Sequence, residues 1–141
     1  MLEIINNKVN KNMLKLFKGK RILFLENDYS LPEDSGENLA RWLIEQKIEH
    51  NALYNLEALP FDYIMDQIQW FDVIVFETTW TYDIAKKLFD AITKMSRKKI
   101  FVEVYIDKPS WYRKPKGIVH DLYIIQTYGI SMNDWKFEKL K

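Results

Sequence analysis

Short, continuously apolar runs separated by helical patterns constrain the fold of this chain more than any other feature. The run from Val73 to Phe76 has no polar position, and a second such run extends from Ile22 to Leu25. Runs of this length without alternation are typical of strands that are buried on both faces. Strands that alternate with helical segments indicate a parallel sheet covered on both faces. Further strand patterns cover residues 99–106 and 121–127, and a weaker one covers residues 48–54.

We therefore predict an α/β fold of the flavodoxin-like or Rossmann-like kind, a three-layer sandwich with a mostly parallel five-stranded sheet. A chain of 141 residues is the size of one domain, and residues 20–141 are expected to form it. Residues 1–19 are expected to form a basic amphipathic helix that ends at Gly19. Such a helix packs on its own domain, or it binds a partner or a membrane surface. Further helices are predicted at residues 37–47, 60–68, 83–95 and 132–140.

The composition excludes several kinds of site. Cysteine is absent, which excludes disulfides, thiol nucleophiles and thiolate metal sites. The two histidines, His50 and His120, have no partner at metal-ligand spacing, so a histidine-based metal site is not expected. No apolar run approaches the roughly 20 residues that span a membrane, and the N-terminus lacks a signal-peptide pattern. We therefore expect a cytoplasmic protein without a transmembrane segment.

The net charge of +1 hides an uneven distribution of charge along the chain. Residues 1–25 contain six Lys or Arg and one Glu, and residues 91–141 contain eleven bases and five acids. The central residues 26–90 contain fourteen acids and four bases. Two interpretations stay open: a solvated surface of mixed sign, or a surface that steers a charged partner.

Polar residues follow the predicted strands at their carboxyl ends, where ligands bind in open α/β sheets. If the strand order is 2-1-3-4-5, the first and third strands are neighbours, and Glu26, Asp28 and Glu77 converge. Three carboxylates repel one another unless a cation or proton neutralises them, and Mg²⁺ takes oxygen ligands of this type. These three acids are the candidate metal ligands; the alternative is that they face water. The predicted ligand-binding set is Glu26, Asn27, Asp28, Glu77, Thr78, Trp80, Tyr105 and Gln126.

At these positions the chain resembles a response-regulator receiver domain. ILFLEND resembles the first strand of that family with its acidic pair, and DVIVFE resembles the third strand, which ends on the phosphate-accepting aspartate. Glu77 fills the place of that aspartate. DLYIIQTY is similar to the fifth strand, with Gln126 and Thr127 at the places of a lysine and a cis-proline. The resemblance implies a pseudo-receiver, a non-catalytic regulatory or protein-binding module.

Two other resemblances imply an enzyme instead. Nucleoside 2-deoxyribosyltransferase-like domains place an acidic nucleophile on the helix after a strand such as DVIVFETTW, and Asp90 is the nearest equivalent. The N-terminal half of a glycosyltransferase has a similar strand order. Under this alternative the chain acts on a nucleoside or sugar nucleotide, with Glu77 and Asp90 as catalytic candidates. Acids in ENDYSLPED disfavour FMN, and the lack of a glycine-rich phosphate motif disfavours NAD.

The segment SWYRKPKG mixes aromatic and basic residues, which suits a protein interface or, alternatively, a surface loop whose aromatics pack inward. We predict a protein partner, and the sequence is compatible with a homodimer. The acidic central region opposes nucleic-acid binding. The predicted interaction surface comprises Trp111, Tyr112, Arg113 and Lys114.

Overall fold

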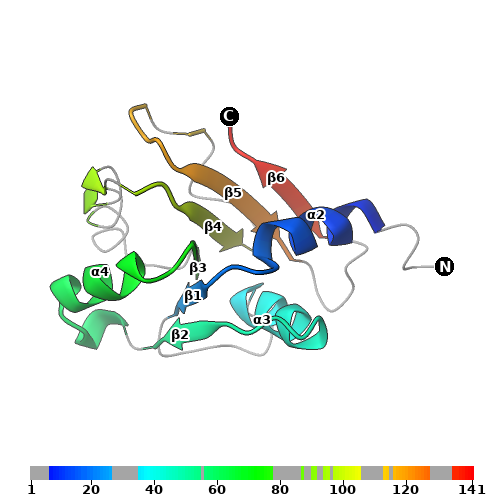
Figure 1. The fold of residues 1–141 in the computed structure, drawn as a ribbon, viewed down its shortest axis with the longest axis horizontal. Coiled ribbons are helices and arrows are strands. Elements are labelled where there is room, and N and C mark those ends of the chain that lie inside the picture. The colour runs from blue at the N-terminus through cyan, green and yellow to red at the C-terminus, as the bar shows by residue number, and fades with distance from the viewer. Residues whose placement is uncertain are drawn as a thin grey trace.

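The computed structural model describes residues 7–26, 35–54, 56–77, 97–105, 116–127 and 135–141, with Lys87, Asp90, Ala91, Lys94, Met95, Arg113 and Lys114. A six-stranded sheet in the order β2-β1-β3-β4-β5-β6 forms its centre (Figure 1). Five strands run parallel, and β6 is antiparallel to β5. The predicted α/β class is confirmed, and the observed order meets the condition 2-1-3-4-5 on which the convergence of the strand ends depended. The strands are β1 (Ile22–Leu25), β2 (Asn51–Leu53), β3 (Val73–Glu77), β4 (Ile100–Tyr105), β5 (Asp121–Gln126) and β6 (Lys136–Lys139).

Helices cover both faces of the sheet, which gives three layers. Alternate residues of each strand point to opposite faces, so Ile22 and Phe24 pack with α2 (Asn7–Phe17) and α3 (Ser35–Glu45). Leu23 and Leu25 pack on the other face with α4 (Phe61–Gln69) and the 3-10 turn η1 (Leu56–Ala58). Pro60 precedes α4 as predicted. The described residues between β3 and β4 include helical ones at Lys87, Asp90, Ala91 and Lys94.

The prediction of five strands was wrong, because residues 136–139 form a sixth strand where a short helix was expected. Trp135 and Phe137 both pack on the side of α2 and α3, which is the period of a strand. Phe137 pairs with Ile125 in register, and its ring stacks on Tyr123 with centroids 5.4 Å apart. The short segment fits either period in isolation, so pairing with β5 decides its conformation.

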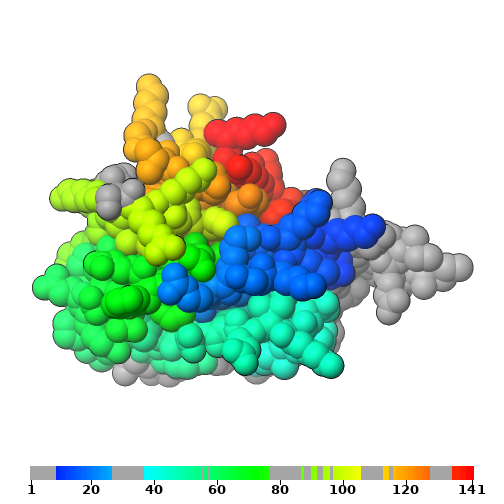
Figure 2. Space-filling model, viewed as in Figure 1, coloured from blue at the N-terminus to red at the C-terminus, as the bar shows by residue number. Residues whose placement is uncertain are grey.

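The N-terminal helix packs on its own chain. Met13, Leu16 and Phe17 are buried, and the last two turns of α2 thus contribute directly to the core. The indole nitrogen of Trp42 in α3 donates a hydrogen bond to Asn10 Oδ1 at 3.0 Å. Figure 2 shows α2 lying against α3 on the molecular surface. Of the alternatives for this basic helix, the structure shows packing on its own domain.

Candidate functional site

The carboxyl ends of β1, β3, β4 and β5 lie side by side, as the predicted ligand site requires. Leu25 is in register with Phe76, so Glu26 and Glu77 each end one of two neighbouring strands. Glu77 in turn pairs with Val104, and Tyr105 pairs with Gln126. The strand ends that the sequence analysis selected are therefore brought together. Asn27, Asp28, Thr78, Trp80, Trp111 and Tyr112 lie outside the described residues, as does the side chain of Glu77.

Glu26 and Tyr54 form a polar pair at this edge. The backbone N–H of Glu26 donates to the carbonyl of Leu53 at 2.9 Å, which holds Glu26 beside the end of β2. The Glu26 charge, with a smaller effect of burial, raises the pKa of Tyr54 above its usual value. Tyr54 is 61% exposed, so its hydroxyl is available at the surface. Tyr54 was not among the predicted site residues, because it ends the weakest of the predicted strands.

A buried polar group lies on the α4 side of the same edge. Tyr105 and Gln126 are buried, and Glu103 is completely buried although it is an acid. Glu103 alternates with Phe101 and Tyr105 and is paired with Ile124, so Gln126 is its diagonal neighbour on the same face. Glu103 was not among the predicted site residues. The signal available was an acid inside the otherwise apolar strand IFVEVY.

The remaining predicted residues are the catalytic candidate Asp90, the interaction residues Arg113 and Lys114, and the proposed metal ligands. Asp90 is exposed on a helical segment, Arg113 is exposed and Lys114 is half-buried. The proposed Mg²⁺ ligands stay a prediction, because Asp28 and the Glu77 side chain lie outside the described residues. Within the described part of the chain, no group of three or more histidines and acids is placed to hold a metal ion.

The amino edge of the sheet, at the opposite ends of the strands, carries a network of charges. The Asp72 carboxylate accepts a hydrogen bond from the Arg21 backbone N–H at 2.9 Å. The guanidinium groups of Arg21 and Arg97 lie 3.5 and 3.6 Å from the same carboxylate. The Arg21 N–H, opposed by burial and supported by both guanidinium groups, holds the pKa of Asp72 below its usual value. One acid is thus shared between two cations.

Lys99 ties α4 to the start of β4 at this edge. Its ammonium donates hydrogen bonds to the carbonyls of Gln69 at 3.1 Å and Phe71 at 2.6 Å. Gln69 is the last residue of α4 and Phe71 lies two residues beyond it, at the end of the helix where carbonyls are left without partners. The backbone N–H of Lys99 donates to Nδ1 of the buried His120 at 2.9 Å. Burial lowers the pKa of Lys99, and Arg97 adds to the effect.

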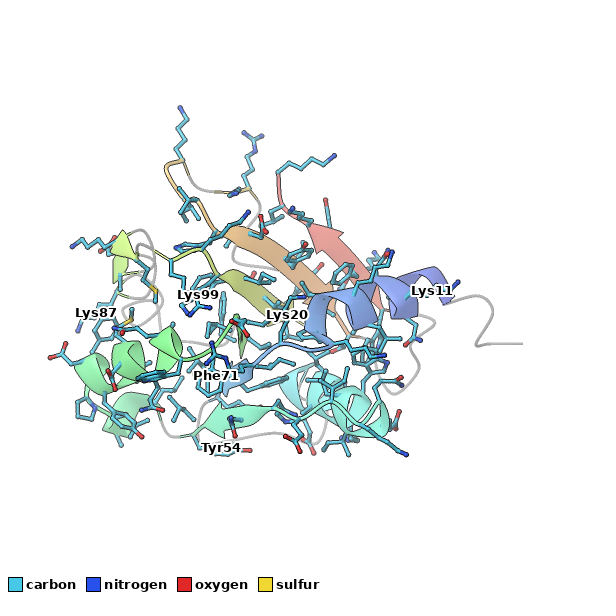
Figure 3. The ribbon with its side chains drawn as sticks, in the orientation of Figure 1. Lys11, Lys20, Tyr54, Phe71, Lys87 and Lys99 are labelled. Carbon is cyan, nitrogen blue, oxygen red and sulfur yellow. The ribbon has the colours of Figure 1, made fainter. Side chains whose placement is uncertain are left out.

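A hollow of about 810 Å³ opens between these charges and the ends of α3 and α4. Two of its walls are exposed apolar side chains, Ile44 at 66% and Trp70 at 62%. Burial lowers the pKa of His50, which also lines it. Figure 3 labels Lys20 and Phe71, which line the hollow just before β1 and β3. The full lining is Lys20, Arg21, Ile22, Ile44, Lys47, Ile48, Glu49, His50, Asn51, Trp70 and Phe71.

Lys47, on the rim of this hollow, has an unusual backbone conformation. Its φ is 59°, and it is the one described non-glycine residue with positive φ. The Ile48 N–H donates to the Leu43 carbonyl at 2.9 Å and the Lys47 N–H to the Ile44 carbonyl at 3.0 Å. This is the Schellman pattern that ends helices, in which glycine normally occupies the left-handed position. Gly19, with φ of 77°, occupies the matching position after α2.

Replacing Lys47 by glycine should raise the free energy of unfolding by about 1 kcal/mol, because glycine adopts this conformation without a Cβ clash. Urea denaturation followed by circular dichroism measures the change. The matched control is Gly19→Ala, which should lower stability by about 1 kcal/mol. A Cβ at Gly19 would have no atom within 4 Å, so only backbone strain changes there. A destabilised Lys47→Gly variant would contradict this account.

The hollow was missed because sequence reasoning placed the site at the carboxyl ends of the strands. The available signal was the basic pair Lys20 and Arg21, which lies directly before a strand. None of the helices in the described residues is long and apolar enough to cross a membrane.

Comparison of the chain with protein-family models, curated proteins and solved structures finds no match.

Proposed function

We propose that this protein is a non-catalytic, receiver-like regulatory module that works by binding another protein. The observation that supports this most is the end of the fifth parallel strand. By the resemblance to receiver domains, Gln126 and Thr127 take the places of the lysine and the cis-proline. Both residues are buried, at 4% and 1% exposure. An amide at this position cannot supply the positive charge that senses a phosphoryl group.

Lys99, the one lysine that is buried among the described residues, lies at the wrong end of the sheet for phosphotransfer. Lys99 precedes β4, whereas the receiver-like site would lie beyond the carboxyl end of that strand. The six residues of β4 separate the two points by roughly 20 Å. Its ammonium is also engaged by the carbonyls of Gln69 and Phe71. The enzyme alternative has less support, because its candidate nucleophile Asp90 is exposed on a helical segment.

Incubation with Mg²⁺ and acetyl phosphate should leave the protein unmodified, because the longer Glu77 side chain and the neutral Gln126 do not match a phosphoacceptor site. Intact-mass spectrometry at neutral pH measures the result, with an active receiver domain as the positive control. Glu77→Asp should also remain unmodified, since the cation is still missing. Stoichiometric acyl phosphate on the natural chain that is lost in Glu77→Gln would refute the proposed function.

A further inference from the structure

The hollow at the amino edge combines positive charge with exposed apolar surface. Three cations and one acid, Glu49, line it. Exposed hydrophobic side chains that gather at one place mark interaction sites more often than scattered ones do. Trp70 and Ile44 are two of the five large hydrophobic residues exposed in the described structure, and both belong to this lining. Phe71, half-buried between them and the sheet, extends the apolar wall.

The positive charge of the lining is not neutralised within the described residues. Arg21 shares the single carboxylate of Asp72 with Arg97. The Lys20 ammonium donates to the carbonyls of Lys15 at 3.0 Å and Leu16 at 2.9 Å, which orients it but leaves its charge unpaired by an acid. The Lys47 ammonium has no hydrogen bond or ion pair among the described residues. A partner that reaches this surface meets an excess of cations.

The left-handed backbone of Lys47 is an independent sign of a working surface. A non-glycine residue in this conformation costs on the order of 1 kcal/mol, and such outliers cluster at binding sites. α2 ends on a glycine and avoids that cost, whereas α3 ends on a lysine whose side chain lines the hollow. A lysine that is kept in a strained backbone conformation is expected where its charge takes part in binding.

From these features we infer that the amino-edge hollow docks an acidic segment of a partner protein, with one bulky apolar side chain seated against Trp70 and Phe71. The segment's carboxylates meet Arg21 and Lys47 at the rim. Trp and Arg are the residue types that most often anchor protein interfaces. This inference rests on the proposed binding function and names the chemistry of the partner.

A compact phosphate fits the same hollow less well. α2, α3 and α4 all end at this edge, and the carbonyls at helix C-termini carry partial negative charge. Phosphates are bound preferentially at helix N-termini, where N–H groups point outward. An extended acidic segment keeps its carboxylates at the rim, away from these carbonyls, while its apolar side chain enters the hollow. The cations of the lining are then paired with carboxylates, and the apolar wall is covered by the apolar side chain.

The test is an NMR titration of the full ¹⁵N-labelled chain with a synthetic peptide in which glutamates flank one Phe and one Leu. We expect it to shift the Trp70 indole resonance, assigned with Trp70→Phe, and the Lys47 amide. A peptide with Lys in place of Glu, and one with Ser in place of Phe and Leu, should leave both unshifted.

Trp70→Ala should weaken binding about thirty-fold. Lys47→Gly should weaken it about five-fold while making the fold more stable. Lys136→Gln, a charge removal on β6, is the matched control and should bind as the natural chain does.

Several outcomes would overturn the inference. No shift of Trp70 at about 1 mM acidic peptide would do so, and so would equal binding of the three peptides or an unchanged affinity in Lys47→Gly. Inorganic phosphate that shifts Trp70 as strongly as the peptide would identify a small-anion site instead. Shifts of Trp70 on dilution of the protein alone would identify a second copy as the occupant. Acyl-phosphate formation would refute the proposed function without moving Trp70, so the two failures are distinguishable.

Discussion

Replacing Trp42 by alanine should lower the free energy of unfolding by about 3–5 kcal/mol. The Trp42 side chain is 3% exposed, and its ring meets Phe17 edge-on with centroids 6.2 Å apart. Its indole nitrogen also donates to Asn10 Oδ1 at 3.0 Å. Truncation therefore removes both the apolar contact and the hydrogen bond that join α3 to the N-terminal helix. Urea denaturation followed by far-ultraviolet circular dichroism measures the loss.

Two milder variants separate these contributions. Trp42→Phe keeps an aromatic ring in place, and Asn10→Ala removes the acceptor; each should cost about 1 kcal/mol through the lost hydrogen bond. Combined, they should cost little more than either alone, because they break the same bond. If Trp42→Ala cost less than about 1 kcal/mol, the packing of α2 on α3 would not contribute to stability in solution.

Replacing Lys99 by methionine should lower the free energy of unfolding by about 2–3 kcal/mol near neutral pH. Methionine keeps the apolar stem but leaves the carbonyls of Gln69 and Phe71 without their charged donor. The loss should also depend on pH. Burial lowers the folded pKa of Lys99 below its ordinary value of 10.5, so the unfolded chain binds this proton more tightly. The contribution of Lys99 to the free energy of unfolding therefore rises between its folded pKa and 10.5.

The methionine variant lacks this rise, so its deficit should be larger at about pH 10 than near neutrality. Urea titrations at both values measure it. Lys98→Met is the matched control: its side chain is 64% exposed and its ion pair with Asp121 spans 3.4 Å. That variant should lose at most about 1 kcal/mol, with no such widening. A deficit in Lys99→Met that shrinks as pH rises would show that burial does not lower this pKa.

Much of the fold could be predicted from periodicity. The apolar runs that became β1 and β3 admit one interpretation, because a strand buried on both faces leaves no polar position in the sequence. Pro60 and Gly19 marked helix boundaries through backbone constraints that act locally. The prediction of a helix at residues 136–139 was wrong because the conformation of this short segment depends on its pairing with β5. That pairing is a long-range contact and is not visible in the local sequence pattern.

The candidate site was less predictable. The meeting of the carboxyl ends follows from the strand order, and that order was stated as a condition in the sequence analysis. Glu103 was not predicted as a site residue, because a single acid within an apolar strand pattern does not change the prediction of a buried strand. The amino-edge hollow was not found because Trp70, Ile44 and Lys47 come from the ends of different helices, and only the packed fold brings helix ends together.

The outer strands of the sheet limit how a partner can be bound. β2 has three residues, and β6 presents exposed Lys136, Glu138 and Lys139 along its length. Short and charged border strands resist pairing with the backbone of another chain. Recognition by strand addition, in which a peptide extends the sheet through main-chain hydrogen bonds, is therefore disfavoured at both borders. A partner is then more readily recognised by side chains, such as those that line the amino-edge hollow, than by the backbone of the sheet.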